Sequence, residues 1–271
     1  MRHLGLMFLS FTLVANAQVA DTSYWKHNGV GGVTVTQVSY TDWAQGGENA
    51  LAWTASLEGK SIYAVESSIW TTNYNFAYGN TKLGSQGVRK TDDKIDMASE
   101  FKYIVGVDVN PYVAASFKTQ FTKGYAYDAL GVGTPISDFF DPAFLTQSAG
   151  AGYQPVPEVK TRIGVALREI LTNTYTNYSG GEKTSVEGGM ESVTELDARL
   201  EENLFFKSKL ELFSPFRKME EVVVRSDNTL IAKISQYFST NLNVQIIHEK
   251  PISARTQVKQ TLALGFSYVL F

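Results

Sequence analysis

Residues 95–105 read IDMASEFKYIV, and this stretch decides the fold class. Alternate positions from Ile95 to Val105 are mostly apolar, whereas the positions between them, from Lys94 to Lys102, are mostly charged. A strand sends successive side chains to opposite faces, so one face here is apolar and the other is charged. In a soluble sandwich the apolar face meets a second sheet. In an outer-membrane barrel it meets lipid, and the polar face lines the lumen.

The same alternation recurs along the chain. It predicts twelve strands, at residues 33–40, 51–57, 70–78, 95–105, 113–121, 145–153, 159–167, 190–200, 204–212, 224–234, 238–246 and 258–270. No helical periodicity competes with it after the N-terminus. Segments of this kind, separated by turn residues, are typical of an all-β protein.

The connections between these segments alternate in length. Long connections cover residues 41–49, 79–91, 126–142, 172–186, 217–220 and 249–255. Short ones lie at 60–62, 107–110, 154–158, 201–203 and near 237. Transmembrane barrels have short periplasmic turns and longer external loops. We therefore predict a transmembrane up-and-down antiparallel β-barrel of about twelve strands, formed as one domain by residues 30–271.

The N-terminus has the three parts of a secretory signal peptide. Met1–His3 carries a positive charge, residues 4–15 are apolar, and Ala15-Asn16-Ala17 is a small-residue cleavage site. A membrane anchor is the alternative, but the apolar run is too short to span a bilayer and no cysteine follows it for lipidation. We predict that residues 1–17 are removed, that 18–29 are a short periplasmic segment, and that the protein is in the cell outer membrane.

Composition excludes several classes of function. The 271 residues include no cysteine, which excludes disulfides, thiolate zinc sites and a cysteine nucleophile. The formal net charge of −3 and the absence of a basic run argue against a nucleic-acid partner. The mean hydropathy of −0.13 excludes a bundle of membrane-spanning helices, but not a barrel, whose apolar surface is every second residue.

The C-terminus reads GFSYVLF, residues 265–271. A terminal aromatic residue on an alternating strand is similar to the signal that outer-membrane assembly machinery reads, although Phe271 is in the small-residue lane of Gly265 and Ser267. We predict that this machinery and outer-membrane lipid are partners, and that the barrel is a monomer.

The charged lane predicts the lining of the interior. Its members are Lys94, Asp96, Glu100, Lys102, Lys118, Lys160, Arg162, Arg168, Glu191, Glu195, Asp197, Arg199, Lys207, Lys209, Glu211, Arg225, Asp227 and Lys233. Both signs are present, with a basic excess. Either the charges pair across the interior and close it, or they line a narrow aqueous path that favours small anions. Twelve strands lie between filled and open barrels, so size does not decide.

The external loops hold the candidates for ligand contact, which are Asp42, Trp43, Glu48, Arg89, Asp92 and Asp93. Clustered aspartates could bind a hard cation such as Ca²⁺. Basic residues interleave with them, however, and ion pairs between loops explain the pattern better. We predict no metal and no cofactor.

Catalysis has one weak candidate. His248 ends a predicted strand near the external rim, with Glu249 beside it and Ser253 as the nearest hydroxyl. A lipid-modifying enzyme would need base, nucleophile and orienting group within hydrogen-bond reach. No motif supports this arrangement, so we predict no catalytic residue and no enzyme.

Several motifs occur in a distinctive order: DWAQGGEN at residues 42–49, RKTDDKID at 89–96, FKTQFTKGYAY at 117–127, ISDFFDPAFL at 136–145, LELFS at 210–214 and GFSY at 265–268. With these motifs the chain resembles a Bacteroidetes family of outer-membrane β-barrels catalogued as a domain of unknown function. The resemblance covers about residues 24–271 and is strongest over 40–145 and at the end. It implies a barrel in the outer membrane and no particular activity.

Three functions therefore stay open. The first is a narrow channel for small polar or anionic solutes. The second is a non-catalytic structural or interaction barrel of an envelope complex. The third is a lipid-modifying enzyme. Paired charges in a dry interior would favour the second, and a continuous water path would favour the first.

Overall fold

The computed structural model describes residues 24–39, 49–85, 87–250, 253 and 255–270. The predicted signal peptide at residues 1–17 lies outside the described residues, as do residues 18–23. Asp42, Trp43 and Glu48, three of the candidates for ligand contact, also lie outside them.

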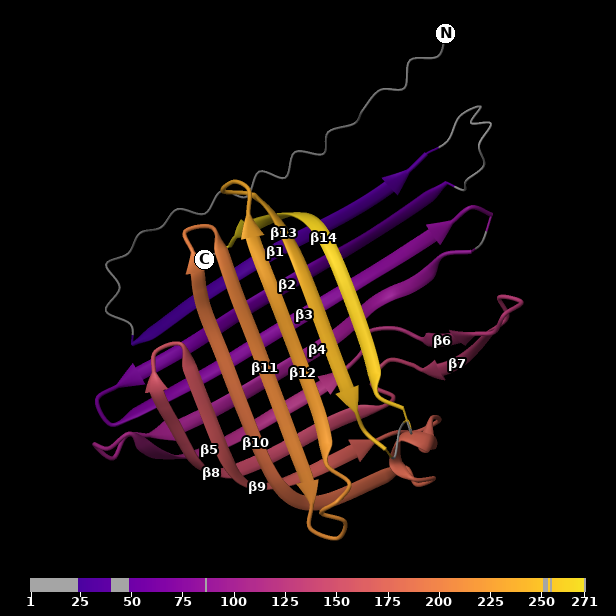
Figure 1. Ribbon diagram of the computed structural model, residues 1–271. Helices are drawn as coiled ribbons and strands as arrows, with labels where there is room; N and C mark the ends of the chain where they lie inside the picture. The colour runs from indigo at the N-terminus through magenta and orange to yellow at the C-terminus, as the bar shows by residue number, and fades with distance from the viewer. Residues whose placement is uncertain (1–23, 40–48, 86, 251–252, 254, 271) are drawn as a thin grey trace.

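The predicted fold class is confirmed, because twelve antiparallel strands form a closed barrel (Figure 1). Each barrel strand pairs with the next along the chain, except that β5 pairs with β8, and β14 closes the barrel on β1. The barrel strands are β1 (Trp25–Val38), β2 (Ala50–Val65), β3 (Ser68–Leu83), β4 (Arg89–Tyr103), β5 (Val109–Thr119), β8 (Ala143–Val156), β9 (Val159–Leu171), β10 (Thr184–Glu201), β11 (Leu204–Pro215), β12 (Val223–Lys233), β13 (Phe238–His248) and β14 (Gln257–Val269). Every predicted strand overlaps one of them.

Two further strands were not predicted. β6 (Gly124–Tyr127) and β7 (Gly133–Ser137) form a hairpin within the connection between β5 and β8, where the sequence suggested a plain loop over residues 126–142. Strands of four and five residues are too short to show the alternation that revealed the others. β1 also begins earlier than the predicted domain boundary at residue 30, and Trp25–Gly29 pair with Gly59–Tyr63 of β2.

The two ends of the barrel differ in their connections. The short-turn end has the links at residues 66–67, 104–108, 157–158, 202–203 and 234–237. The long-loop end carries the β6–β7 hairpin and the link between β9 and β10, which contains the 3₁₀ turn η1 (Thr176–Ser179) (Figure 1). Gly106 has a φ of +82° in the turn at residues 104–108, a conformation that favours glycine. No helix among the described residues has the length and apolar character needed to cross a membrane.

The outer surface of the barrel is apolar. Many members of the predicted apolar lanes are exposed, including Phe101 at 42%, Val113 at 55%, Val165 at 59% and Leu264 at 60%. Contiguous exposed apolar surface of this kind is unusual for a protein surrounded by water. The large apolar side chains on the outside therefore indicate a surface that is suited to apolar surroundings and not to water.

The seam between β1 and β14 is short. In the described pairing, Val30–Thr34 pair with Gly265–Val269 and the ladder stops there. Residues 35–38 of β1 continue on their other side with β2, and residues 257–264 of β14 continue with β13. Toward the long-loop end, these two strands separate (Figure 1).

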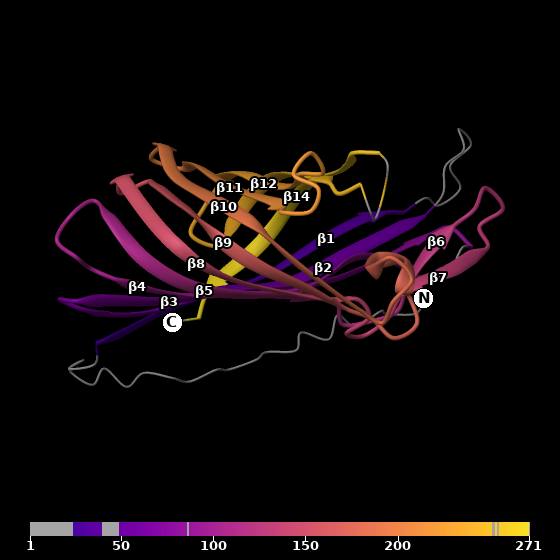
Figure 2. The same cartoon turned by 90° about the horizontal axis from the view of Figure 1, so that it is seen from below.

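The barrel is flattened, with β1–β4 in one wall and β10–β12 in the opposite wall (Figure 2). Side chains from opposite walls can therefore meet in the interior. This shape positions the charged lane that the sequence analysis singled out.

Candidate functional site: a charged network across the barrel interior

Ion pairs between strands that are not neighbours identify the interior. Lys94 Nζ on β4 lies 3.7 Å from Asp227 Oδ2 on β12, and Lys259 Nζ on β14 lies 3.1 Å from Asp92 Oδ1 on β4. These strands are separated by several others in the barrel order. The side chains can meet only by extending through the interior, so the charges lie inside the wall.

A second group of charges lies around Glu211 of β11. Lys118 of β5 forms an ion pair with Glu211 and lies 4.0 Å from Asp96, while Lys209 Nζ is 2.7 Å from Glu211 Oε1. Two lysines thus neutralise one carboxylate. The side chains of Lys118 and Glu211 are 21% and 20% exposed, so this group keeps some contact with solvent.

Arg162 of β9 is the centre of a third group. Its Nη1 donates to Glu100 Oε2 at 2.7 Å, and its Nη2 lies 3.6 Å from Glu191 Oε2. Its guanidinium is 5.2 Å from the centre of the Tyr112 ring. Gly164 leaves space for this ring, because a Cβ there would lie 2.7 Å from the Tyr112 hydroxyl oxygen. Arg162 Nε and Glu191 Oε2 have no hydrogen-bond partner among the described residues.

The most buried group lies toward the long-loop end. Glu249, the first residue after β13, is 1% exposed. Arg168 of β9 binds one oxygen of its carboxylate, and Arg225 Nη2 of β12 lies 2.8 Å from the other. Burial alone would raise the pKa of Glu249, but the charges and hydrogen bonds of Arg225 and Arg168 outweigh it and hold this pKa below its usual 4.5. We name these three residues the Glu249 cluster.

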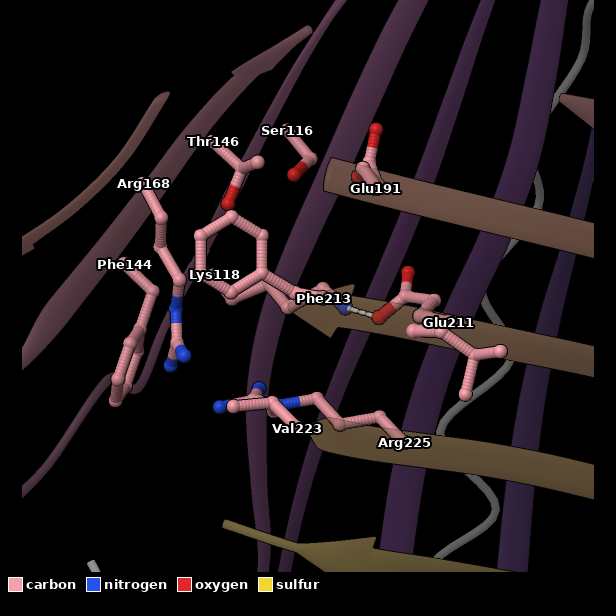
Figure 3. Close-up of a pocket in the computed structure, with 11 residues that line it drawn as sticks. Ser116, Lys118, Phe144, Thr146, Arg168, Glu191, Glu211, Phe213, Val223 and Arg225 are labelled. Carbon is pink, nitrogen blue, oxygen red and sulfur yellow. Dashed lines mark hydrogen bonds and ion pairs between the residues drawn. The ribbon is translucent and has the colours of Figure 1, made fainter. Parts of the chain in front are cut away.

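Aromatic rings support the two arginines. The guanidinium carbons of Arg168 and Arg225 lie 5.6 and 5.1 Å from the centre of the Phe144 ring, and that of Arg168 is 5.8 Å from Phe213. Figure 3 shows both guanidinium groups turned toward the same space beside Phe144. Such cation–π contacts add attraction where water is excluded.

A cavity of about 50 Å³ adjoins the Glu249 cluster. Its lining includes Ser116, Thr146, Lys118, Glu191 and Glu211 as well as the two arginines (Figure 3). Since one water needs roughly 10–15 Å³ of such volume, the cavity has room for a few water molecules. The interior at this level is polar and narrow.

The remaining predicted lumen charges lie closer to the short-turn end. Arg199 donates to the carbonyl oxygens of Glu201 and Glu202, and both Arg199 and Lys233 lie over the ring of Phe205. Lys102 lines a second cavity of about 340 Å³. The register sets opposite charges in facing positions there, Lys160 with Glu195 and Lys207 with Asp197.

The described candidates for ligand contact, Arg89, Asp92 and Asp93, lie on β4 and not in an external loop, and they do not form one pocket. Arg89 lies 4.1 Å above the Tyr127 ring, and Asp92 pairs with Lys259. Asp93 accepts hydrogen bonds from Lys90 and from the backbone and hydroxyl of Thr122. These contacts tie β4 to the connection after β5. Within the described ranges, no group of three or more acidic or histidine side chains could hold a metal ion.

The three residues considered for catalysis, His248, Glu249 and Ser253, have side chains that contact other described residues and not one another. His248 Nδ1 is 3.0 Å from Thr256 Oγ1, and Ser253 Oγ donates to the carbonyl oxygen of Arg255 at 3.0 Å. The Glu249 carboxylate is occupied by two arginines. Among the described contacts, no hydrogen bond joins the side chains of these three residues.

Glu249 is the interior charge that the sequence analysis placed in a loop. Its number gives it the same phase as Gln245 and Ile247, which are opposite Asp227 and Arg225 in the register. The alternation of β13 therefore pointed inward at this position. Extending the strand by one residue would have found it.

Comparison with known proteins finds one family model that matches part of the chain and several solved barrels of similar fold. A family model described as a protein of unknown function (DUF3078) matches residues 35–125. This match supports the predicted resemblance to a family of unknown function, in the region of the motifs at 42–49 and 89–96. Its occurrence in the Bacteroidetes stays a prediction. No curated protein matches the sequence.

Three solved structures are similar in fold at low identity. An outer membrane channel from Pseudomonas putida F1 is 12% identical, with 93% of this chain and 99% of that chain covered and a TM-score of 0.40. The translocator domain of the autotransporter NalP from Neisseria meningitidis is 10% identical, with 92% and 89% covered and a TM-score of 0.39. OmpT, an outer membrane protein of Vibrio cholerae, is 8% identical, with 93% and 100% covered and a TM-score of 0.32.

Proposed function

We propose that this protein is an outer-membrane β-barrel that provides a narrow path for small polar or anionic solutes. The observation that carries the proposal is the inversion of polarity across the wall. Apolar side chains cover the outside, while charged side chains cross the inside. Lipid outside and water inside are the two solvents that match these faces.

The outer face supports the membrane location. Side chains such as Val113, Ile163 and Leu262 are 55%, 53% and 77% exposed. Exposing them to water would be unfavourable by about 25 cal/mol per Å² of apolar surface. Burying them in hydrocarbon removes that cost. Export directed by residues 1–17, insertion by the assembly machinery, a monomeric state and membership of the unknown-function family are parts of the same proposal.

The interior supports a path more than an inert filling. A buried ion pair is rarely more stabilising than apolar side chains of the same volume. A barrel that needed only stability would be filled better with apolar residues. The Lys94–Asp227 and Lys259–Asp92 pairs are also partly exposed, with Asp227 at 38% and Lys259 at 41%, so water reaches them.

A second function, a closed structural barrel, is favoured by one observation. The pairs Lys94–Asp227 and Lys118–Glu211 join opposite parts of the wall. Such cross-links stiffen the barrel and obstruct its centre. The two functions differ in whether these pairs open.

Single-channel recording in a planar bilayer tests the proposal. We expect discrete conductance steps from the folded protein, with selectivity for small anions because basic residues exceed acidic ones among the interior charges. Lys94→Met should change the selectivity, whereas Lys82→Met, an exposed position on β3, is the matched control. Absence of steps in folded, membrane-inserted wild type, and in the Lys94→Met variant, would overturn the channel and favour the structural barrel.

A further inference from the structure

We propose that Arg168 and Arg225 form a binding site for the carboxylate of a small external ligand, and that Glu249 occupies this site in the structure. The inference deepens the proposed function, because it names the class of solute that enters the path.

The donor arrangement matches a carboxylate. Arg168 binds one oxygen of Glu249 and Arg225 binds the other, so the two arginines share a single anion. Charge-assisted hydrogen bonds of this kind are short and strong, and guanidinium groups match the planar carboxylate. The rings of Phe144 and Phe213 limit where the guanidinium groups can lie. The donors are thus held ready for any carboxylate that reaches them.

The three charged groups differ in how they are anchored. Arg168 and Arg225 lie within β9 and β12, where backbone ladders fix them. These strands are not neighbours in the barrel order, so the closed wall itself brings the two arginines together. Glu249 follows the end of β13 and lies in the connection to β14. A carboxylate on a connection can be exchanged for another without moving a barrel strand.

The cavity beside the cluster defines the size of the ligand. Its volume of about 50 Å³ has room for only a short extension beyond a carboxylate. The hydroxyls of Ser116 and Thr146 and the ammonium group of Lys118 line it, and these groups favour a polar ligand. The lining carries three positive charges on Lys118, Arg168 and Arg225 and two negative charges on Glu191 and Glu211. Without Glu249, one positive charge is left for an incoming anion.

Carboxylate rescue of a Glu249→Ala variant tests the site. The purified barrel is refolded in detergent, and its thermal unfolding is followed by the heat-dependent shift in gel mobility. Removal of the Glu249 carboxylate leaves the buried Arg168 and the half-buried Arg225 without their anion, so we expect the midpoint of unfolding to fall by roughly 5–10 °C. Formate or acetate should restore most of this loss with a saturable dose dependence, at about tenfold lower concentration than chloride.

Two further variants make the result specific. Glu221→Ala removes a carboxylate from another connection, where it pairs with Lys218 near the surface, and acetate should have no effect on it. Glu249→Gln keeps the size of the side chain, and serves if Glu249→Ala does not fold. In Glu249→Gln the glutamine side chain still takes up space, so formate, the smaller anion, should raise the unfolding midpoint, whereas acetate should be too large to bind.

Lack of rescue by formate and acetate in both Glu249 variants would overturn the site. If chloride rescued Glu249→Ala as well as acetate does, the site would have no preference for carboxylates. The same conclusion would follow if acetate stabilised Glu221→Ala and wild type as much as it stabilises Glu249→Ala. These results do not depend on conduction, because the readout is unfolding. A silent bilayer recording with positive rescue would therefore reject the channel and keep the binding site.

Discussion

The Glu249 cluster and the Lys94–Asp227 pair are both ionic contacts inside the same barrel, but they differ in burial. The side chains of Arg168 and Glu249 are 7% and 1% exposed, whereas those of Lys94 and Asp227 are 27% and 38% exposed. Contact with water weakens an ion pair and also removes the penalty for leaving a charge alone. The cluster therefore fixes the structure, while the pair can open at little cost.

Arg168→Met should have the largest effect on stability. It leaves the buried Glu249 carboxylate with one arginine, and breaking a buried ion pair in this way costs about 3–5 kcal/mol. Chemical unfolding of the refolded barrel in lipid vesicles measures the change. Arg168→Lys keeps the charge without the planar fork and should lose less. A cost for Arg168→Met as small as that for Lys94→Met would remove the distinction between the two regions.

Acid should remove the stabilisation that the Glu249 carboxylate gives to the cluster. The pKa of Glu249 is lowered in the folded state, because the pull of Arg225 and Arg168 exceeds the effect of burial. A lowered pKa gives stability that is complete above the ordinary value of 4.5 and is lost as the pH falls through the folded value. Wild type should therefore lose more stability below pH 4.5 than Glu249→Gln does. Identical pH profiles for the two proteins would contradict this assignment.

Arg162→Met is the intermediate case. Its partner Glu191 is 10% exposed, between the values of the two regions compared, and its partner Glu100 is 28% exposed, close to the value for Lys94. We expect a loss of about 1–3 kcal/mol, since Glu191 is left buried while Glu100 keeps contact with water. The same unfolding assay measures it. A value outside the interval set by Arg168→Met and Lys94→Met would show that burial does not order these contacts.

Lys94→Met should have the smallest effect on stability and a visible effect on conduction. The pair with Asp227 is long, at 3.7 Å, and partly exposed, so its loss costs less than about 1 kcal/mol. Removing a positive charge from the interior should lower the preference for anions in bilayer recordings. Unchanged selectivity, with Lys82→Met as reference, would place Lys94 away from any ion path.

The sequence predicted the strands of the barrel, but it did not predict which charged residues meet. Period-two alternation identified all twelve barrel strands. The partner of each charge depends on the flattening of the barrel and on the position of each residue along the barrel axis, which the strand register sets. Neither is encoded in a local pattern. The pair Lys118–Glu211 joins residues that are 93 positions apart.

The two misses have different physical causes. The β6–β7 hairpin is too short for alternation to show, and the pairing of Gly124 with Ser137 includes a register irregularity. Glu249 was missed because it was assigned to the connection at residues 249–255, directly after β13, which ends at His248. A glutamate one residue beyond a strand looks like a solvated loop charge. Only the closed barrel shows that Arg168 and Arg225 lie next to this carboxylate.

The short seam between β1 and β14 has a consequence for the order of unfolding. A ladder of five residue pairs joins the first and last strands, whereas β1 and β2 pair along the whole of Trp25–Val38. Local opening begins where the fewest backbone hydrogen bonds have to break together. The contacts across the seam also join the most distant parts of the chain, and such contacts form late because closing the loop costs entropy. Amide hydrogens at Val30–Thr34 and Gly265–Val269 that face the seam should therefore exchange with solvent sooner than those of the central ladders, so that the last junction to form is the first to come apart.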